Sequence, residues 1–176
     1  FEGVEGCGKS FQSKKLLNNL KKKRIPALLT REPGGTKSAE LIRNLILKDY
    51  FNHDSKEKFD KYTDTLLYLA ARNEHIKNKI DPALKKKSVV ICDRFTDSTL
   101  AYQVYGKNVN INFINNIHKF ILGKIKPNLI FVLKVSTETS KKRLKKRKNK
   151  NRYDNFAQNF YSKAQNSFLK IAKNKK

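Results

Sequence analysis

Residues 3–10 read Gly-Val-Glu-Gly-Cys-Gly-Lys-Ser, a full match to the pattern G-x-x-x-x-G-K-[ST]. They stand between the apolar start Phe1-Glu2 and a stretch from about Lys9 to Lys23 whose leucines recur at helical spacing. Glycines let such a loop curl so that N–H groups point inward, and the positive end of the following helix faces the same space. The run therefore predicts a phosphate loop for a nucleotide. Its expected contact residues are Gly3, Val4, Glu5, Gly6, Cys7, Gly8, Lys9 and Ser10.

The same loop predicts a metal partner. Lys9 is expected to neutralise the β and γ phosphates, and the Ser10 hydroxyl to ligate Mg²⁺. Asp93 directly follows the apolar run Ser88–Cys92, which is where phosphate-loop enzymes carry the carboxylate that reaches the metal. A carboxylate at a strand end is often only a solvated loop residue, so Asp93 gains its weight from the loop. We expect Ser10 and Asp93 to hold the metal.

Strand-like and helix-like runs alternate along the chain, and no repeat or linker divides it. This alternation predicts a three-layer α/β fold, a parallel sheet flanked by helices, in a single domain over residues 1–176. The expected strands are Phe1-Glu2, Pro26–Thr30, Ser88–Cys92 and Asn128–Val135. The expected helices are about Lys9–Lys23, Ser38–Lys48, Lys58–Ile80, Asn112–Leu122, Thr137–Lys148 and a last one ending near Lys173.

The composition limits the class of protein. The chain carries 40 Lys and Arg against 15 Asp and Glu, a formal charge of +25, which fits nucleic acid, small phosphate-bearing substrates or the bias of an A/T-rich genome. No apolar run approaches the roughly 18 residues of a membrane span, so we expect a soluble, cytoplasmic protein. The cysteines and histidines are separated in sequence, which predicts neither a disulfide framework nor a zinc site. Because the chain has no methionine and starts beside the loop, we expect a fragment.

Arginine is informative because lysine is the default basic residue here. A guanidinium is a planar fork that holds phosphate oxygens in pairs and never loses its charge, so lysine replaces it poorly. Each arginine has the alternative of being simple surface decoration. The candidates are Arg31, Arg43, Arg72, Arg94, Arg143, Arg147 and Arg152.

Five blocks, which occur in family order and spacing, make the chain resemble the thymidylate kinases. The two most specific are Thr30–Thr36 (TREPGGT) and Asp93–Gln103 (DRF followed by DSTLAYQ). The others are Phe1–Ser10 (FEGVEGCGKS), Leu66–Arg72 (LLYLAAR) and Arg143–Asp154 (RLKKRKNKNRYD). The resemblance implies a P-loop NTPase fold of the nucleoside monophosphate kinase type, and transfer of a phosphoryl group from ATP to dTMP with Mg²⁺, in dTTP biosynthesis.

The resemblance also implies roles for single residues. Glu5 would face the deoxyribose 3′-hydroxyl, Arg94 and Arg43 would hold the dTMP phosphate, and Arg72 would address the thymine edge. Tyr68 falls where the family usually has a phenylalanine stacked on the base, and its ring still serves, although the hydroxyl needs a partner. The remaining residues expected to line the nucleoside pocket are Pro33 at its rim, Ser98, Tyr102 and Gln103.

Members of this family carry an auxiliary arginine either in the phosphate loop or in a lid. Because the loop position is Gly6, the resemblance assigns the chain to the bacterial type, with a lid at about 143–155. Arg147 would then be catalytic, with Lys9 and Arg94, while Arg143 would contact ATP. The lid motif departs from the family pattern at Asn151 and Asp154, and the family continues with another strand and helix. Its members are commonly homodimers, with the helix at Lys58–Ile80 as a candidate interface.

Other functions stay open at this stage. Another small-molecule kinase on the same fold is the first alternative, and TREPGGT argues against it. A nucleic-acid-binding ATPase is the second, and the charge of +25 favours it, although we expect no nucleic-acid partner. An inactive remnant is the third.

Overall fold

The computed structural model describes residues 1–48, 58–146 and 158–174, and its central sheet is parallel. Strand β1 (Ala27–Arg31) pairs with β2 (Val89–Asp93), with Ala27 opposite Val89 and Arg31 opposite Asp93. The sheet continues beyond β2 through Phe1: its ammonium donates to the Cys92 carbonyl at 2.8 Å, and its carbonyl accepts from Arg94 N at 2.9 Å. The segment 1–2 thus lies beside β2 and places the phosphate loop at the carboxyl end of the sheet.

The strand expected over Asn128–Val135 is wrong in extent. The structure has one isolated parallel bridge there, between Glu2 and Val132, supported by Glu2 N to Phe131 O at 2.8 Å and Leu133 N to Glu2 O at 2.9 Å. The pairing ends after Glu2 because the chain enters the phosphate loop at Gly3. The segment still runs alongside the sheet, so the spatial order is β1, β2, 1–2 and 131–133.

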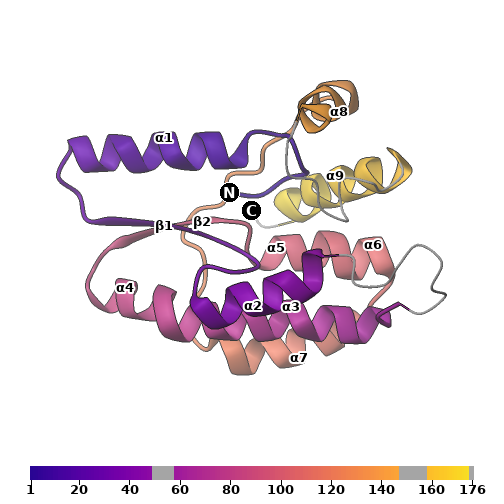
Figure 1. Cartoon of the computed structure of the whole chain (residues 1–176), viewed down its shortest axis with the longest axis horizontal. Coiled ribbons are helices and arrows are strands. Elements are labelled where there is room, and N and C mark those ends of the chain that lie inside the picture. Colours follow the sequence, from indigo (N-terminus) through magenta and orange to yellow (C-terminus); the bar gives the residue numbers. More distant parts are fainter. Residues whose placement is uncertain (49–57, 147–157, 175–176) are drawn as a thin grey trace.

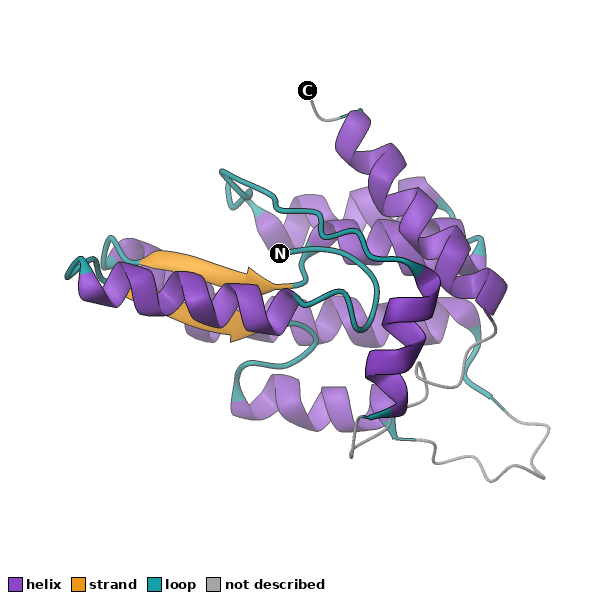
Figure 2. Cartoon of the chain, turned by 90° about the horizontal axis from the view of Figure 1, so that it is seen from above, coloured by secondary structure: helices purple, strands orange, loops and turns teal. Residues whose placement is uncertain are grey.

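Helices cover both faces of the strands. Figure 1 shows α1 on one side of β1 and β2, and α4, α2, α3 and α7 on the other, while Figure 2 shows α1 lying over the strands. The α-helices are α1 (Lys9–Lys22), α2 (Lys37–Leu47), α3 (Lys61–His75), α4 (Asp81–Lys85), α5 (Thr96–Thr99), α6 (Tyr105–Lys107), α7 (Ile111–Leu122), α8 (Thr137–Lys145) and α9 (Gln158–Lys173).

The helix expected at Lys58–Ile80 starts later and continues further. Asp60 caps α3, its carboxylate accepting from Tyr62 N at 2.7 Å. After α3 the chain turns through the π-helical segment η1 (Ile76–Ile80) into α4. One continuous helix was expected here, because no residue type marks the extra residue of a π-turn.

The helical stretch after β2 was not predicted. It consists of α5, a second π-helical segment η2 (Leu100–Val104) and α6. Ala101, Tyr102 and Gln103 follow one another in η2 and are all buried. Polar residues at buried positions hide the apolar period on which a helix prediction rests.

The main apolar core lies beneath the phosphate loop. Val4 and Tyr102 pack there against Ala164, Phe168 and Ile171 of α9. Helix α9 therefore packs against the loop and supports it. Among the described residues, no helix is both long enough and apolar enough to cross a bilayer.

Candidate active site

The phosphate loop, residues 3–10, leads directly into α1. Gly8 forms the N-cap of α1 with a φ of 101°, a conformation that residues with a Cβ rarely adopt. A Cβ on Gly3 would lie 2.5 Å from the Leu133 carbonyl oxygen, so only glycine fits this close approach. The loop ends at a helix N-terminus, where free N–H groups and the helix dipole favour an anion.

Lys9 is buried in the mouth of this loop. Its Nζ donates to the carbonyls of Gly3 at 3.0 Å and Val4 at 2.9 Å, and lies 3.7 Å from the Cys7 sulfur. Burial, and then the charge of Arg94, lower the pKa of Lys9. A phosphate beside Nζ would favour the charged form, so the position suits an anion contact.

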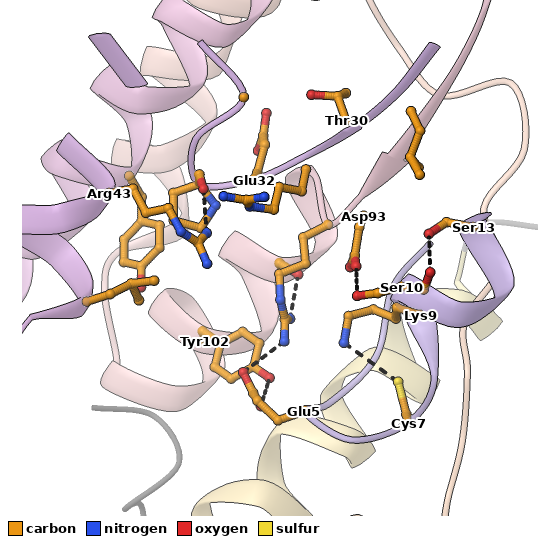
Figure 3. A pocket seen from close by; sticks show the side chains of 18 of the residues that line it. Glu5, Cys7, Lys9, Ser10, Ser13, Thr30, Glu32, Arg43, Asp93 and Tyr102 are labelled. Carbon is orange, nitrogen blue, oxygen red and sulfur yellow. Dashed lines mark hydrogen bonds and ion pairs between the residues drawn. The ribbon is translucent and has the colours of Figure 1, made fainter. Parts of the chain in front are cut away.

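Ser10 and Asp93 meet beside Lys9. The Ser10 hydroxyl donates to an Asp93 carboxylate oxygen at 2.6 Å, although 83 positions separate the two residues. Figure 3 shows the pair between the end of β2 and the start of α1. A hydroxyl and a carboxylate are hard oxygen donors, the kind that Mg²⁺ prefers, so the pair fits the predicted metal site.

A buried cluster of Glu5, Arg94 and Tyr102 faces the loop. One carboxylate oxygen of Glu5 accepts from Arg94 at 2.8 Å and the other accepts from the Tyr102 hydroxyl at 2.7 Å. The Arg94 guanidinium also lies over the Tyr102 ring, 5.2 Å from its centroid. Burial alone would raise the pKa of Glu5, but Arg94 and Lys9 outweigh it and hold that pKa below its ordinary value. Glu5 is therefore an ionised acceptor within the phosphate loop itself.

Arg94 has a strained backbone conformation, and hydrogen bonds of neighbouring residues hold it in place. Arg94 has a φ of 73°, in the left-handed region, which costs a residue with a Cβ about 1–2 kcal/mol. Buried Glu2 holds the next turn in place, accepting from Phe95 N at 2.8 Å and from the Ser98 hydroxyl at 2.6 Å. Arg94 itself donates to the Ser98 hydroxyl at 3.2 Å. These contacts fix where the guanidinium points.

Arg43 and Pro33, predicted for the dTMP phosphate and for the rim of the pocket, are in contact and both line the cavity. An Arg43 nitrogen donates to the Pro33 carbonyl at 2.5 Å, and its Nε lies 3.9 Å from Glu40. The peptide bond before Pro33 is cis. Arg31 donates to both carboxylate oxygens of Glu40 at 3.1 Å. The result is an arginine-rich edge across the cavity from Lys9.

Arg72 lines the cavity but is held in a buried network. It donates from Nε to Glu32 at 2.7 Å, and from its other nitrogens to the Thr99 hydroxyl at 2.8 Å, to His118 Nε2 at 2.9 Å and to the Phe95 carbonyl at 2.9 Å. Each nitrogen of Arg72 thus has a protein partner in the structure. Its role at the thymine edge stays a prediction.

Gln103 has an unsatisfied donor at the cavity wall. The residue is buried, and its Nε2 has no hydrogen-bond partner in the described part of the chain. Such a donor costs about 1–3 kcal/mol when it is left unpaired. Gln103 is also one of the residues that line the cavity.

All these groups share one cavity of about 1750 Å³. Sites for a single small molecule measure roughly 300–1,000 Å³, so the space suits two nucleotides. The predicted site residues that line it are Glu5, Gly6, Cys7, Gly8, Lys9, Ser10, Pro33, Arg43, Tyr68, Arg72, Asp93, Arg94, Ser98, Tyr102, Gln103 and Arg143.

Two predicted residues, Gly3 and Val4, do not line the cavity. Both are buried, and Val4 belongs to the apolar core. Arg147 lies outside the described residues, as do Arg152 and the lid departures at Asn151 and Asp154. Arg143 on α8 reaches the loop and donates to the Gly6 carbonyl at 2.9 Å.

Sequence reasoning missed the partners of Arg72. Glu32 is 5% and Arg72 is 3% exposed, and burial would raise the pKa of Glu32, but the charge of Arg72 keeps it lowered. Burial, and then Arg72, lower the pKa of His118 to about 4, so it is neutral and accepts the hydrogen bond. The carboxylate directly after β1 was a signal for Glu32, but no sequence pattern pairs it with a residue 40 positions away.

The sequence predicted no zinc site because cysteines and histidines are separated along the chain, but packing brings His75 and Cys92 close together. Their ligand atoms and a carboxylate oxygen of Glu32 lie within 4.8 Å of one another. Each already has a hydrogen-bond partner: His75 lies 2.6 Å from the Thr30 hydroxyl and 3.2 Å from Glu32, and Cys92 donates to a backbone carbonyl at 3.0 Å. The group therefore belongs to the buried network around Arg72.

The chain is similar to known proteins along its whole length. The family model described as thymidylate kinase matches residues 1–176. A thymidylate kinase of Wolbachia pipientis wMel is 40% identical over 98% of this chain and 83% of the relative, and one of Lactobacillus helveticus is 40% identical over 97% and 80%. The crystal structure of thymidylate kinase from Ehrlichia chaffeensis superposes with a TM-score of 0.75 at 32% identity, covering 99% of this chain and 79% of that chain.

Proposed function

Since the chain belongs to the thymidylate kinase family, has its P-loop NTPase fold and phosphorylates dTMP with ATP in nucleotide biosynthesis, we propose that both nucleotides meet in the one cavity. The observation that carries this proposal is that the phosphate loop and the Glu5–Arg94–Tyr102 cluster face the same space. A γ-phosphoryl group then passes from ATP to a phosphate oxygen of dTMP, giving ADP and dTDP. No covalent intermediate is needed, because positioning and positive charge lower the barrier.

The donor side is built on the phosphate loop. Lys9 contacts the β and γ phosphates, and Ser10 and Asp93 would hold Mg²⁺, which would supply further neutralisation of phosphate charge. The 2.6 Å contact between the Ser10 hydroxyl and Asp93 supports this assignment, because the two oxygens are close enough together to bind the same ion. Arg143 contacts ATP from α8.

The acceptor side is built on the buried cluster. Arg94 and Arg43 bind the dTMP phosphate, and ionised Glu5 accepts a hydrogen bond from the 3′-hydroxyl. The position of Tyr102 against Glu5 narrows the space beside the sugar and so disfavours a 2′-hydroxyl. The lowered pKa of Glu5 supports its acceptor role at neutral pH.

The base is bound by stacking and by its edge. Tyr68 stacks on the pyrimidine, and the unpaired Nε2 of Gln103 donates to a ring carbonyl oxygen. Arg72 addresses the same edge after one of its protein contacts is exchanged. Ser98 and Pro33 complete the wall.

The remaining assignments concern the whole molecule. Residues 1–176 form a single domain in the cytoplasm, and a lid at about 143–155 delivers Arg147 to the transferring group, excluding water as it closes.

The chain forms homodimers through α2 and α3, where Leu41, Leu45 and Leu66 are exposed. Analytical ultracentrifugation of wild type and of Leu41→Asp tests this: a wild-type monomer would contradict it.

An acceptor panel tests the function. ADP release with ATP and Mg²⁺ is measured with dTMP, dUMP, AMP, CMP and shikimate, and we expect turnover with dTMP to exceed that with every other acceptor. Faster turnover with another acceptor would favour a different small-molecule kinase. ATP turnover that depends on DNA and not on dTMP would favour a nucleic-acid-binding ATPase. A thermal melt that dTMP does not shift, together with no turnover, would indicate an inactive chain.

A further inference from the structure

Phe11 is an exposed aromatic residue at the edge of the active-site cavity. It lies in the first turn of α1, directly after Ser10, and is 69% exposed. Single exposed apolar residues occur on most protein surfaces, so exposure alone has no meaning. Phe11, however, is the one exposed large apolar residue in the described parts of the chain that also lines the cavity. Its ring is therefore available to whatever occupies that end.

The cavity has a second end that the acceptor does not need. In Figure 3, Arg43 and Tyr102 lie to one side of Lys9, and Ser13 of α1 lies to the other. The residues from α1 beyond Ser10, and from α8 and its end, that also line the cavity are Phe11, Gln12, Ser13, Lys14, Arg143, Leu144 and Lys146.

The path of the donor nucleotide follows from the two ends of the cavity. The inference drawn from it rests on the proposed function. With the triphosphate in the phosphate loop and dTMP at Tyr102, the sugar and base of the donor leave past Gly8. Phe11 N donates to the Gly8 carbonyl at 3.1 Å, and an Arg143 nitrogen lies 3.9 Å from the point that a Cβ on Gly8 would occupy. A group leaving the loop at Gly8 thus meets α1 on one side and α8 on the other.

We propose that the ring of Phe11 packs against the base and sugar of the donor nucleotide and forms the apolar wall of its subsite. The flat face of an aromatic ring matches the flat face of any nucleobase, and stacking of this kind does not depend on hydrogen-bonding groups. Phe11 therefore strengthens binding of the donor without selecting adenine over guanine.

The test is a steady-state comparison of wild type with Phe11→Ala and Phe11→Tyr. Stacking on an aromatic side chain is worth about 1–3 kcal/mol per base, so Phe11→Ala is expected to raise KM for ATP by about fivefold or more. KM for GTP should rise by a similar factor, KM for dTMP should stay unchanged, and Phe11→Tyr should restore the wild-type values. Competition by inorganic triphosphate, which has no base, should be equal in all variants.

Phe120→Ala is the matched control, since Phe120 is 85% exposed on α7 and does not line the cavity. The Phe120→Ala variant should leave the KM values for ATP, GTP and dTMP unchanged. An active wild type in which Phe11→Ala keeps the donor KM would overturn the inference alone. A wild type that does not phosphorylate dTMP would instead overturn the proposed function. An equal loss for inorganic triphosphate would show that Phe11 only shapes the loop, which also overturns the inference.

Discussion

Replacing Glu32 by Gln should destabilise the protein strongly, because it leaves the Arg72 guanidinium without its counter-charge. Both residues are almost fully buried, and Arg72 contacts Glu32 through Nε at 2.7 Å. The glutamine keeps the size of the side chain, so no cavity forms and the loss is electrostatic. Breaking a buried pair by removing one partner costs about 3–5 kcal/mol.

The expected magnitude follows from the size of the chain. For domains of about 150–250 residues, 1 kcal/mol shifts Tm by roughly 2–4 °C, so Glu32→Gln should melt roughly 6–20 °C lower. The measurement is thermal unfolding followed by circular dichroism at pH 7, without nucleotides. Glu138→Gln is the matched control, since Glu138 lies exposed in the first turn of α8, and its Tm should change by only a degree or two.

The stabilising effect of Glu32 depends on pH, and the direction of its pKa shift fixes how. The pKa of Glu32 is lowered in the folded protein from 4.5, because Arg72 outweighs the effect of burial. Its ionised form therefore contributes stability above about pH 4.5, and this contribution is lost as pH falls through the folded pKa. The difference in Tm between wild type and Glu32→Gln should be constant near neutral pH and shrink in acid. A variant that melts within 2 °C of wild type at pH 7 would refute the reasoning.

Three further predictions concern the substrate site. Gln103→Met should raise KM for dTMP about tenfold while Tm stays the same or rises, because it removes an unpaired buried donor; a loss of Tm with an unchanged KM would contradict the ligand role. Ser10→Ala should lower kcat about 100-fold or more and raise the Mg²⁺ concentration needed for half-maximal rate, and an unchanged Mg²⁺ titration would remove Ser10 from the metal site. Arg147→Ala should lower kcat by about two or more orders of magnitude with little change in KM for dTMP, and near wild-type turnover would exclude it from the mechanism.

The sequence predicted the elements whose pattern is local. The loop at 3–10, the helices α1, α2 and α7 and the strands β1 and β2 follow from glycine spacing and apolar period, and their ends agree within about two residues. The segment 128–135 failed because a strand needs a neighbour, and a propensity for β structure cannot show how long that neighbour is.

The candidate site likewise contains contacts that the sequence predicted and contacts that it did not. Residues that lie in motifs, such as Ser10 and Asp93, could be paired beforehand because the chemistry demands a partner for each. The network of Arg72 with Glu32, Thr99 and His118 could not, since it joins four elements and appears only after they pack. The sequence singled out Arg72 as a ligand contact, but no pattern in it joined Arg72 to these partners.

The π-helical segment η2 makes the shape of the cavity wall depend on the number of residues after β2. Tyr102 and Gln103 stand side by side in η2, one reaching Glu5 and the other the cavity wall. A π-turn holds one more residue than an α-turn, and each residue advances an α-helix by about 100°. Deleting a single residue from Leu100–Val104 would let the helix relax to ordinary geometry and swing one of these side chains out of register. An insertion or deletion at this turn would therefore reshape the wall of the cavity while the surrounding scaffold stays intact.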